Sequence, residues 1–196
     1  MSKPYIIAEV ASAHEGRPEL ALKIAKYVVS AGANAIKLQT YTADTITIDH
    51  DGPGFTIEGG LWHGRTLYEL YQEAYTPWEW HAGLQSIAKD IGLDFLSTPF
   101  DATAVDFLES LNVSVYKVAS FETGDIPLLR RVALTGKPVI MSTGMASVLE
   151  IEAAIDTARS SGCKELIVLH CISGYPTPPD QYNLRTISDI AKRFNV

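Results

Sequence analysis

The sequence predicts an α/β protein, and more narrowly a TIM-type (β/α)8 barrel that is truncated after about six βα units. Short apolar strands alternate with amphipathic segments of helical length along the 196 residues, which is typical of a parallel sheet. The units after the second are spaced by roughly 21–27 residues, and eight such units make a barrel of about 250 residues. No glycine-rich nucleotide loop follows the first strand, which favours a barrel over a doubly wound sheet. Either two units are missing, or the sheet is an unusual open one.

The six predicted strands share short runs of Val, Ile, Leu and Ala. They cover residues 5–11, 33–40, 93–98, 114–120, 138–142 and 165–170. The predicted helices share apolar residues at three- and four-residue spacing. They cover residues 18–31, 77–91, 102–111, 126–134, 148–160 and 184–194. Residues 1–196 therefore form one domain in this interpretation, the N-terminal part of a barrel without its seventh and eighth strands.

Start and stop signals support the helix boundaries. Thr76 precedes Pro77, and Glu79 follows three residues after Thr76, which is the pattern of a capping box. Ser147 and Glu150 repeat the pattern. Four glycines each follow a predicted helix, where the left-handed conformation is least costly for glycine. They are Gly32, Gly92, Gly136 and Gly162.

The stretch from residue 41 to residue 75 interrupts the alternation, because it is far longer than an ordinary βα loop. It holds several glycines and aromatic residues. They are Gly52, Gly54, Gly59, Gly60, Gly64, Trp62, Tyr68 and Tyr71. Long loops of this kind are usually functional or disordered. The aromatic residues favour a lid or a wall of a substrate site.

Composition excludes several classes of protein. The formal net charge is −7, and no block of Lys and Arg occurs, so we expect no nucleic-acid or membrane partner. An acidic protein can still contain a small cationic pocket. No apolar run reaches the ~18 residues of a membrane span, and the first residues lack the apolar region of a signal peptide. Cys163 and Cys171 lack metal-site or redox spacing, so we expect a cytoplasmic location and two reduced thiols.

Three predicted strands contain a charged side chain, which is costly in a barrel strand unless it is paired or functional. These side chains are Glu9, Lys37 and Lys117. In the second strand, alternation places Lys37 and Gln39 on the face opposite Ile36 and Leu38, which we expect to meet the helices. The three charged residues lie toward the carboxyl ends of their strands, where barrel active sites are built. A Glu–Lys pair kept only for packing is the alternative, but two lysines and one glutamate leave a positive charge that suits an anion.

Hydroxyl groups follow the other strand ends. Thr98 ends the third strand, Ser120 the fourth and Ser142 the fifth, and Ser173 follows the sixth. Each alone is compatible with a simple helix N-cap. If they converge on one rim with two lysines, they predict hydrogen-bond donors for carboxylate and phosphate oxygens.

A series of motifs, in register along the whole chain, resembles the sialic acid synthase family of phosphoenolpyruvate-condensing enzymes. The motifs are Ile-Ala-Glu at 7–9, Ala-Gly-Ala-Asn-Ala-Ile-Lys-Leu-Gln-Thr-Tyr at 31–41, Ser-Thr-Pro-Phe-Asp at 97–101, Tyr-Lys-Val-Ala-Ser at 116–120, Gly-Lys-Pro-Val-Ile-Met-Ser-Thr-Gly-Met-Ala at 136–146 and His-Cys-Ile-Ser-Gly-Tyr-Pro-Thr-Pro at 170–178. Within the family, Gly-Gly-Leu-Trp at 59–62 and Tyr-Thr-Pro-Trp-Glu-Trp-His at 75–81 are similar to the branch of pseudaminic acid synthases.

The resemblance implies a reaction. C3 of phosphoenolpyruvate attacks the open-chain aldehyde of 2,4-diacetamido-2,4,6-trideoxy-altrose, water adds at C2, and phosphate leaves with cleavage of a C–O bond. It also implies the residues that hold phosphoenolpyruvate, chiefly its carboxylate, and these are Lys37, Thr98, Lys117, Ser120 and Ser142. By the same resemblance, Ser173 contacts the phosphate, Gln39 and Tyr175 contact the sugar, and Glu9 lies beside the reacting carbons.

The resemblance further implies a divalent metal, manganese or magnesium, held by histidines of strands seven and eight. It implies a C-terminal antifreeze-like domain that reaches across a homodimer. Neither set of residues occurs up to Val196, so we expect no metal ligand in this chain, His170 included, and no condensation by these 196 residues alone.

Several alternatives stay open. The family commonly reads Asn-His-(Asn/Glu)-Gly where this chain has Ala13-His14-Glu15-Gly16, so the exact sugar is open and N-acetylneuraminate or legionaminic acid synthase is an alternative. His14 either lines the site or belongs to a surface loop. A Schiff-base aldolase that uses Lys117 is a second alternative, and a non-catalytic domain that binds a sugar or an anion is a third.

Overall fold

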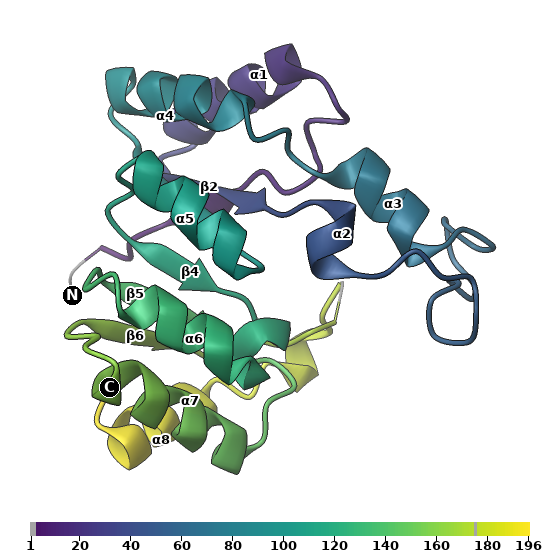
Figure 1. Cartoon of the computed structure of the whole chain (residues 1–196). Helices are drawn as coiled ribbons and strands as arrows, with labels where there is room; N and C mark the ends of the chain where they lie inside the picture. The colour runs from purple at the N-terminus through teal and green to yellow at the C-terminus, as the bar shows by residue number, and fades with distance from the viewer. Residues whose placement is uncertain (1–2, 175) are drawn as a thin grey trace. The chain divides into compact units, whose positions relative to one another are not determined.

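The structure is a computed structural model that describes residues 3–174 and 176–196. The chain divides into two compact units, Met1–Ala104 and Val105–Val196. The six predicted strands occur in the predicted order along the chain, and Figure 1 shows the ribbon of the whole chain. Each unit contains a three-stranded parallel sheet, so the α/β class with parallel strands is confirmed.

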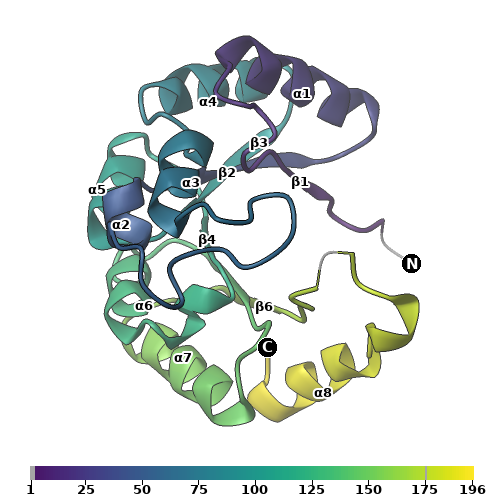
Figure 2. The same ribbon diagram turned by 90° about the vertical axis from the view of Figure 1, so that its right-hand side faces the viewer.

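The first unit is built on strands β1, β2 and β3, hydrogen-bonded in that order. They span Ile7–Glu9, Ala35–Thr40 and Asp94–Pro99. Glu9 lies opposite Lys37 in the register, and Gln39 lies opposite Thr98. Because side chains alternate along a strand, these four residues share one face of the sheet. The helices α1 (Pro18–Ser30) and α4 (Trp80–Asp90) pack side by side, which Figure 2 shows, and α4 also contacts β3.

Most strand ends differ by one or two residues from the prediction, and β1 and the fourth strand are each two residues shorter at both ends. The strand β1 ends at Glu9, although the apolar pattern extends the predicted strand to residue 11. Ala11 has a left-handed backbone with φ of 44°, and this conformation is incompatible with a continued strand. The helix ends agree better, because Gly32, Gly92, Gly136 and Gly162 all adopt the positive φ expected of a residue that ends a helix.

Two helices occupy part of the stretch 41–75, where the sequence predicted only a long loop. They are α2 (Ala43–Ile46) and α3 (Leu67–Ala74). A capping box that the sequence analysis missed begins α3, since the Glu69 backbone N–H donates to the Thr66 hydroxyl at 3.1 Å and the Glu69 carboxylate accepts from the Thr66 N–H at 3.0 Å. Tyr41, directly after β2, packs edge-on against Tyr71 of α3 and against Phe100. These contacts hold α3 beyond the carboxyl end of β2 (Figure 1).

The capping box predicted at Thr76 is wrong. The helix α4 begins at Trp80, and its N-cap Glu79 makes no side-chain capping bond. Thr76 is instead buried, with 1% of its surface exposed, and its hydroxyl lies 3.0 Å from His14 Nε2. His14 is itself fully buried and lies edge-on against Trp80. The Thr76 hydroxyl is therefore bonded to His14 and does not cap the helix as the local pattern predicted. His14 is not a surface residue.

The second unit repeats the strand–helix pattern. Its strands β4, β5 and β6 span Tyr116–Val118, Val139–Ser142 and Leu166–Leu169. Its helices α6, α7 and α8 span Ile126–Ala133, Val148–Ser160 and Arg185–Phe194. Two short 3-10 turns, η1 and η2, span Phe121–Gly124 and Pro179–Gln181. The helix α5 (Ala102–Ser110) begins in the first unit and ends in the second. The predicted capping box of Ser147 and Glu150 is present at the start of α7. Lys117 lies opposite Ile140, and Ser142 lies opposite Leu169.

Among the described residues, no helix combines the length and the apolarity that a membrane crossing requires. Cys163 and Cys171 are both free thiols.

A buried chain of hydrogen bonds joins α4 to the sheet of the first unit. Nδ1 of His81 lies 3.3 Å from the Pro77 carbonyl, which only accepts, so Nδ1 carries the proton. Nε2 then accepts from the Thr40 hydroxyl at 2.9 Å, and Thr40 in turn lies 2.6 Å from the Ser97 hydroxyl. Burial lowers the pKa of His81 to about 4. The neutral imidazole therefore ties α4 to β2 and β3 on the face opposite Gln39 and Thr98.

This burial predicts a pH-dependent stability. The unfolded chain protonates His81 near its ordinary pKa of 6.5, whereas the folded chain does so only near pH 4. Between these pH values the unfolded state binds more protons than the folded state. The contribution of neutral His81 to the free energy of unfolding is therefore complete above pH 6.5 and is lost as pH falls toward 4, by about 3 kcal/mol in all.

Urea denaturation at pH 7, 5 and 4 measures this loss. We expect His81→Gln to lose less stability on acidification than the parent chain. His63→Gln, at an exposed histidine, is the matched control and should behave like the parent. Equal losses in the parent and in His81→Gln would contradict the assignment.

Candidate functional site

The first unit brings four of the predicted site residues together at the carboxyl ends of its strands. Lys37 Nζ lies 2.5 Å from Glu9 Oε1 and 3.4 Å from Thr98 Oγ1. Gln39 Nε2 donates to the same Glu9 oxygen at 3.0 Å. Three strands therefore contribute to one hydrogen-bonded group of side chains, because the parallel register sets Glu9 beside Lys37 and Gln39 beside Thr98.

Lys37 is the most unusual member of this group. Only 6% of its surface is exposed. Burial lowers the pKa of Lys37 below its ordinary value, and the ion pair with Glu9 acts in the opposite direction. An ammonium group carries three N–H donors, so Lys37 can serve Glu9, Thr98 and one further acceptor. A buried cation with a spare donor is suited to an anion.

The alternative, a Glu–Lys pair kept for packing, makes a different energetic claim. When an ion pair is buried, the free energy lost with its hydration is often as large as the free energy gained from its attraction. A buried ion pair is therefore weak evidence for a stabilising role. Glu9 is also the more exposed partner, with 39% of its side-chain surface accessible. One carboxylate oxygen of Glu9 therefore interacts with both Lys37 and Gln39 at a position that solvent and ligands can reach.

The second unit contains Lys117, Ser120, Ser142 and Ser173. Ser120 and Ser173 meet at Gly144, just after β5. The Gly144 N–H donates to Ser120 Oγ at 3.2 Å. A Cβ atom at residue 144 would lie 2.5 Å from Ser173 Oγ and 3.0 Å from Ser120 Oγ, so a side chain here would displace at least the Ser173 hydroxyl. The two serine hydroxyls therefore converge on Gly144, which is a suitable environment for anion oxygens.

Buried threonines fix the ends of the strands that carry these serines. The Thr123 hydroxyl lies 2.5 Å from the Ser142 carbonyl and 3.3 Å from the Ala119 carbonyl, so it bridges the ends of β5 and β4. The Thr143 hydroxyl donates to the Leu169 carbonyl at 2.8 Å and bridges β5 to β6. Both threonines are buried. They hold the backbone of Ser142 and its neighbours without using the serine hydroxyls.

Glu122 is a candidate that the sequence analysis missed. It lies in η1, two residues after Ser120, and within the described part of the chain its Oε2 atom is buried without a hydrogen-bond partner. Burial raises the pKa of Glu122 above its ordinary value, although the charge of Lys117 acts in the opposite direction. A carboxylate in a turn after a strand gives no sequence signal of burial, since this position is usually exposed.

The remaining predictions have mixed outcomes. Tyr175 lies outside the described residues. His14 is buried with Thr76 and Trp80, so it lines neither the Lys37 group nor a surface loop. His170 lies 2.9 Å from the Tyr182 carbonyl. Over residues 3–174 and 176–196, no three His, Cys, Asp or Glu side chains are grouped closely enough to hold a metal ion.

The ion pair generates a testable prediction about stability. Lys37→Met combined with Glu9→Gln keeps the length and approximate volume of both side chains but removes both charges of the pair. We expect the free energy of unfolding to stay constant or to rise by about 1–2 kcal/mol, as for a residue kept for a purpose other than stability.

Urea denaturation at pH 7 measures this effect. Lys23→Met, at an exposed lysine of α1, is the matched control. A loss of more than about 2 kcal/mol in the double variant Lys37→Met/Glu9→Gln would instead support the packing role.

Comparisons with known proteins agree with the motifs. A model of the NeuB family matches residues 24–196. Pseudaminic acid synthase of Campylobacter jejuni subsp. jejuni serotype O:23/36 (strain 81-176) is 42% identical over 194 residues, which cover 99% of this chain and 57% of that protein. Pseudaminic acid synthase of Helicobacter pylori (strain ATCC 700392 / 26695) is 38% identical over 196 residues, which cover 100% of this chain and 58% of that protein. The chain therefore spans somewhat over half the length of these curated relatives.

A solved structure is also similar. The N-acetylneuraminic acid (sialic acid) synthetase of Leptospira borgpetersenii serovar Hardjo-bovis, crystallised in complex with citrate, matches with a TM-score of 0.84 and 29% identity. The match covers 98% of this chain and 62% of that one.

Proposed function

This chain belongs to the NeuB family, and from that premise we propose that it is the phosphoenolpyruvate-binding part of a pseudaminic acid synthase with a (β/α)8 barrel. The reaction is the condensation of phosphoenolpyruvate, 2,4-diacetamido-2,4,6-trideoxy-altrose and water to pseudaminic acid and phosphate. The observation that carries the proposal is the buried Lys37, paired with Glu9 and joined by Gln39 and Thr98 at the carboxyl end of β2. Identity of 38–42% to pseudaminic acid synthases supports the choice of branch.

In this proposal Lys37 and Thr98 bind the carboxylate of phosphoenolpyruvate. The ammonium group is nearly free of water, so its attraction for an anion is stronger than it would be in solvent. The third N–H of Lys37 gives the carboxylate a donor while Glu9 stays in place. Gln39, bound to the same Glu9 oxygen, lies on the side where the sugar aldehyde enters.

The chemistry forms a C–C bond to the aldehyde carbon and a C–O bond from water to C2, and it breaks the C–O bond from C2 to phosphate. The two protons of the water end on the former aldehyde oxygen and on the phosphate, and the water oxygen becomes the C2 ketone. As C3 attacks the aldehyde carbon, positive charge develops at C2 of phosphoenolpyruvate and the aldehyde oxygen takes a proton. Glu9 faces this charge and accepts the proton of the water that adds at C2. The C–O bond to phosphate then breaks, and the phosphate leaves with that electron pair. Holding both reactants in one site supplies much of the rate.

The second unit supplies further anion contacts in this proposal. The hydroxyls of Ser120, Ser142 and Ser173 bind carboxylate or phosphate oxygens, the Gly144 N–H orients the Ser120 hydroxyl, and Lys117 supplies a second positive charge. Glu122 is protonated more readily than an exposed carboxyl because burial raises its pKa. We propose that it exchanges a proton with the phosphate or the new hydroxyl.

The remaining parts of the proposal concern the whole protein. Relatives are longer than this chain, and we propose that a divalent metal, manganese or magnesium, is held outside residues 1–196. The metal would polarise the aldehyde as a Lewis acid. We also propose a cytoplasmic homodimer, and no turnover by these residues alone. Release of phosphate from phosphoenolpyruvate and the sugar, with manganese, tests the last point, and metal-dependent turnover would contradict it.

Three other functions would use the same residues. An N-acetylneuraminate or legionaminic acid synthase differs only in the sugar, and comparing the sugars in the phosphate-release assay of a longer protein separates them. A non-catalytic domain would bind phosphoenolpyruvate or sugar without turnover in any longer form. A Schiff-base aldolase would be trapped at Lys117 by borohydride with pyruvate, whereas the proposed reaction leaves Lys117 unmodified.

Titration calorimetry with phosphoenolpyruvate tests the central observation. We expect the chain to bind phosphoenolpyruvate and Lys37→Met to weaken binding by about tenfold or more, because a charge-assisted hydrogen bond is lost. Lys23→Met is again the control, and it should bind as the parent does. Undiminished binding by Lys37→Met would remove the basis of the proposal.

A further inference from the structure

A cavity of about 460 Å³ lies between α2 and α3, and the reaction steps above do not use it. It is lined by Thr42, Ala43, Asp44, Tyr68, Gln72 and Tyr75. All six residues belong to the first unit. The volume falls within the range of small-molecule sites. The cavity is built from the stretch 41–75, which the sequence analysis interpreted as a lid or a substrate wall.

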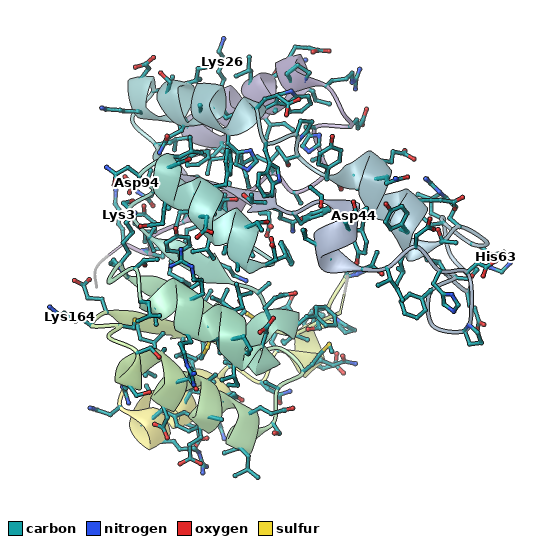
Figure 3. All side chains as sticks on the ribbon, viewed as in Figure 1. Lys3, Lys26, Asp44, His63, Asp94 and Lys164 are labelled. Carbon is teal, nitrogen blue, oxygen red and sulfur yellow. The ribbon has the colours of Figure 1, made fainter. Side chains whose placement is uncertain are left out.

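The cavity lies close to the Lys37 group along the chain. Thr42 follows Gln39 by three residues, so their Cα atoms are at most about 11 Å apart. The edge-on contacts of Tyr41 with Tyr71 and Phe100 fix α3 at this end of the sheet. Figure 3 labels Asp44 on α2, beside α3 and beyond the carboxyl end of β2. The cavity therefore begins within the length of one sugar molecule of Gln39 along the chain.

The polar groups of the cavity are ordered without a ligand. The Tyr68 hydroxyl donates to Asp44 Oδ1 at 2.8 Å, which links α3 to α2. This hydrogen bond to Asp44 is the main cause that raises the pKa of Tyr68, and the Gln72 side chain bonds to the same hydroxyl with the opposite effect. Capping boxes begin both helices. The Tyr68 hydroxyl therefore links the carboxylate of Asp44 to the amide of Gln72.

The charge of the cavity excludes one of the two substrates. Asp44 is the only charged group among the described lining residues, and Asp49 is near enough to raise the pKa of Tyr68 as well. A phosphate or carboxylate would meet negative charge here, whereas the Lys37 group offers positive charge. A neutral ligand with N–H donors, a carbonyl acceptor and an apolar methyl group suits the carboxylate, the amide and the two tyrosine rings.

We propose that this cavity binds an acetamido group of the amino sugar, so that α2 and α3 select for the acetylated substrate. The acetamido N–H donates to Asp44, its carbonyl accepts from the Gln72 amide, and its methyl group contacts the rings of Tyr68 and Tyr75. This inference rests on the proposed function, because it assigns a subsite to the same sugar. The anion and the neutral sugar then occupy separate regions of opposite charge.

The test measures binding of two sugars and of phosphoenolpyruvate separately. The probes are 2,4-diacetamido-2,4,6-trideoxy-altrose and 6-deoxy-altrose, which lacks both acetamido groups, with saturation-transfer NMR following the acetyl methyl signals. We expect Asp44→Ala and Gln72→Ala each to weaken binding of the diacetamido sugar by about tenfold. Neither variant should change binding of 6-deoxy-altrose or of phosphoenolpyruvate. Glu73→Ala, an exposed carboxylate of α3 outside the cavity, is the matched control.

The outcomes distinguish a failure of the acetamido subsite from a failure of the proposed function. If both variants bind the diacetamido sugar as the parent does while Lys37→Met loses phosphoenolpyruvate, the subsite is wrong and the proposed function stands. If the parent binds neither substrate, both are wrong. Tyr68→Phe removes only the hydroxyl that orients Asp44, and it should weaken binding of the diacetamido sugar without changing binding of 6-deoxy-altrose or phosphoenolpyruvate. This variant provides the answer if Asp44→Ala fails to fold, as a thermal melt would show.

Discussion

The burial of Lys37 in the middle of β2 is the constraint on which the first unit depends. A cation cannot stay charged in a sheet interior unless acceptors surround it, and here Glu9 of β1 and Thr98 of β3 do so. Both acceptors are in place only in the parallel register that sets Glu9 beside Lys37 and Gln39 beside Thr98. The same requirement therefore fixes the alignment of three strands and gathers the side chains of the candidate site.

The opposite face of these strands carries a second polar layer. The chain from Pro77 through His81, Thr40 and Ser97 ties α4 to β2 and β3. In the second unit Thr123 and Thr143 bridge neighbouring strand ends in a similar way. Each unit thus uses buried hydroxyls to hold the strand ends that carry the candidate site residues. Such support limits the movement of site residues, which catalysis by positioning requires.

Much of the fold and site could be predicted because local patterns and burial agreed. Alternation placed Lys37 with Gln39, and glycines marked the carboxyl ends of α1, α4, α6 and α7. The prediction failed where a distant partner competed with the local pattern. Thr76 has the sequence of an N-cap, but its hydroxyl is bound to His14, 62 residues away. Glu122 escaped notice because only the packing around η1 buries it.

The sequence alone determined the α/β class, the order of strands and helices, the family and the identity of most candidate site residues, because periodicity and motifs are local properties of the chain. The tertiary structure decided which of these residues touch, the neutral state of His81, and the presence of a cavity between α2 and α3. Those features depend on distances between residues far apart in the chain and on their removal from water. Neither the distance between remote residues nor their removal from water can be predicted from the residues next to them in the sequence.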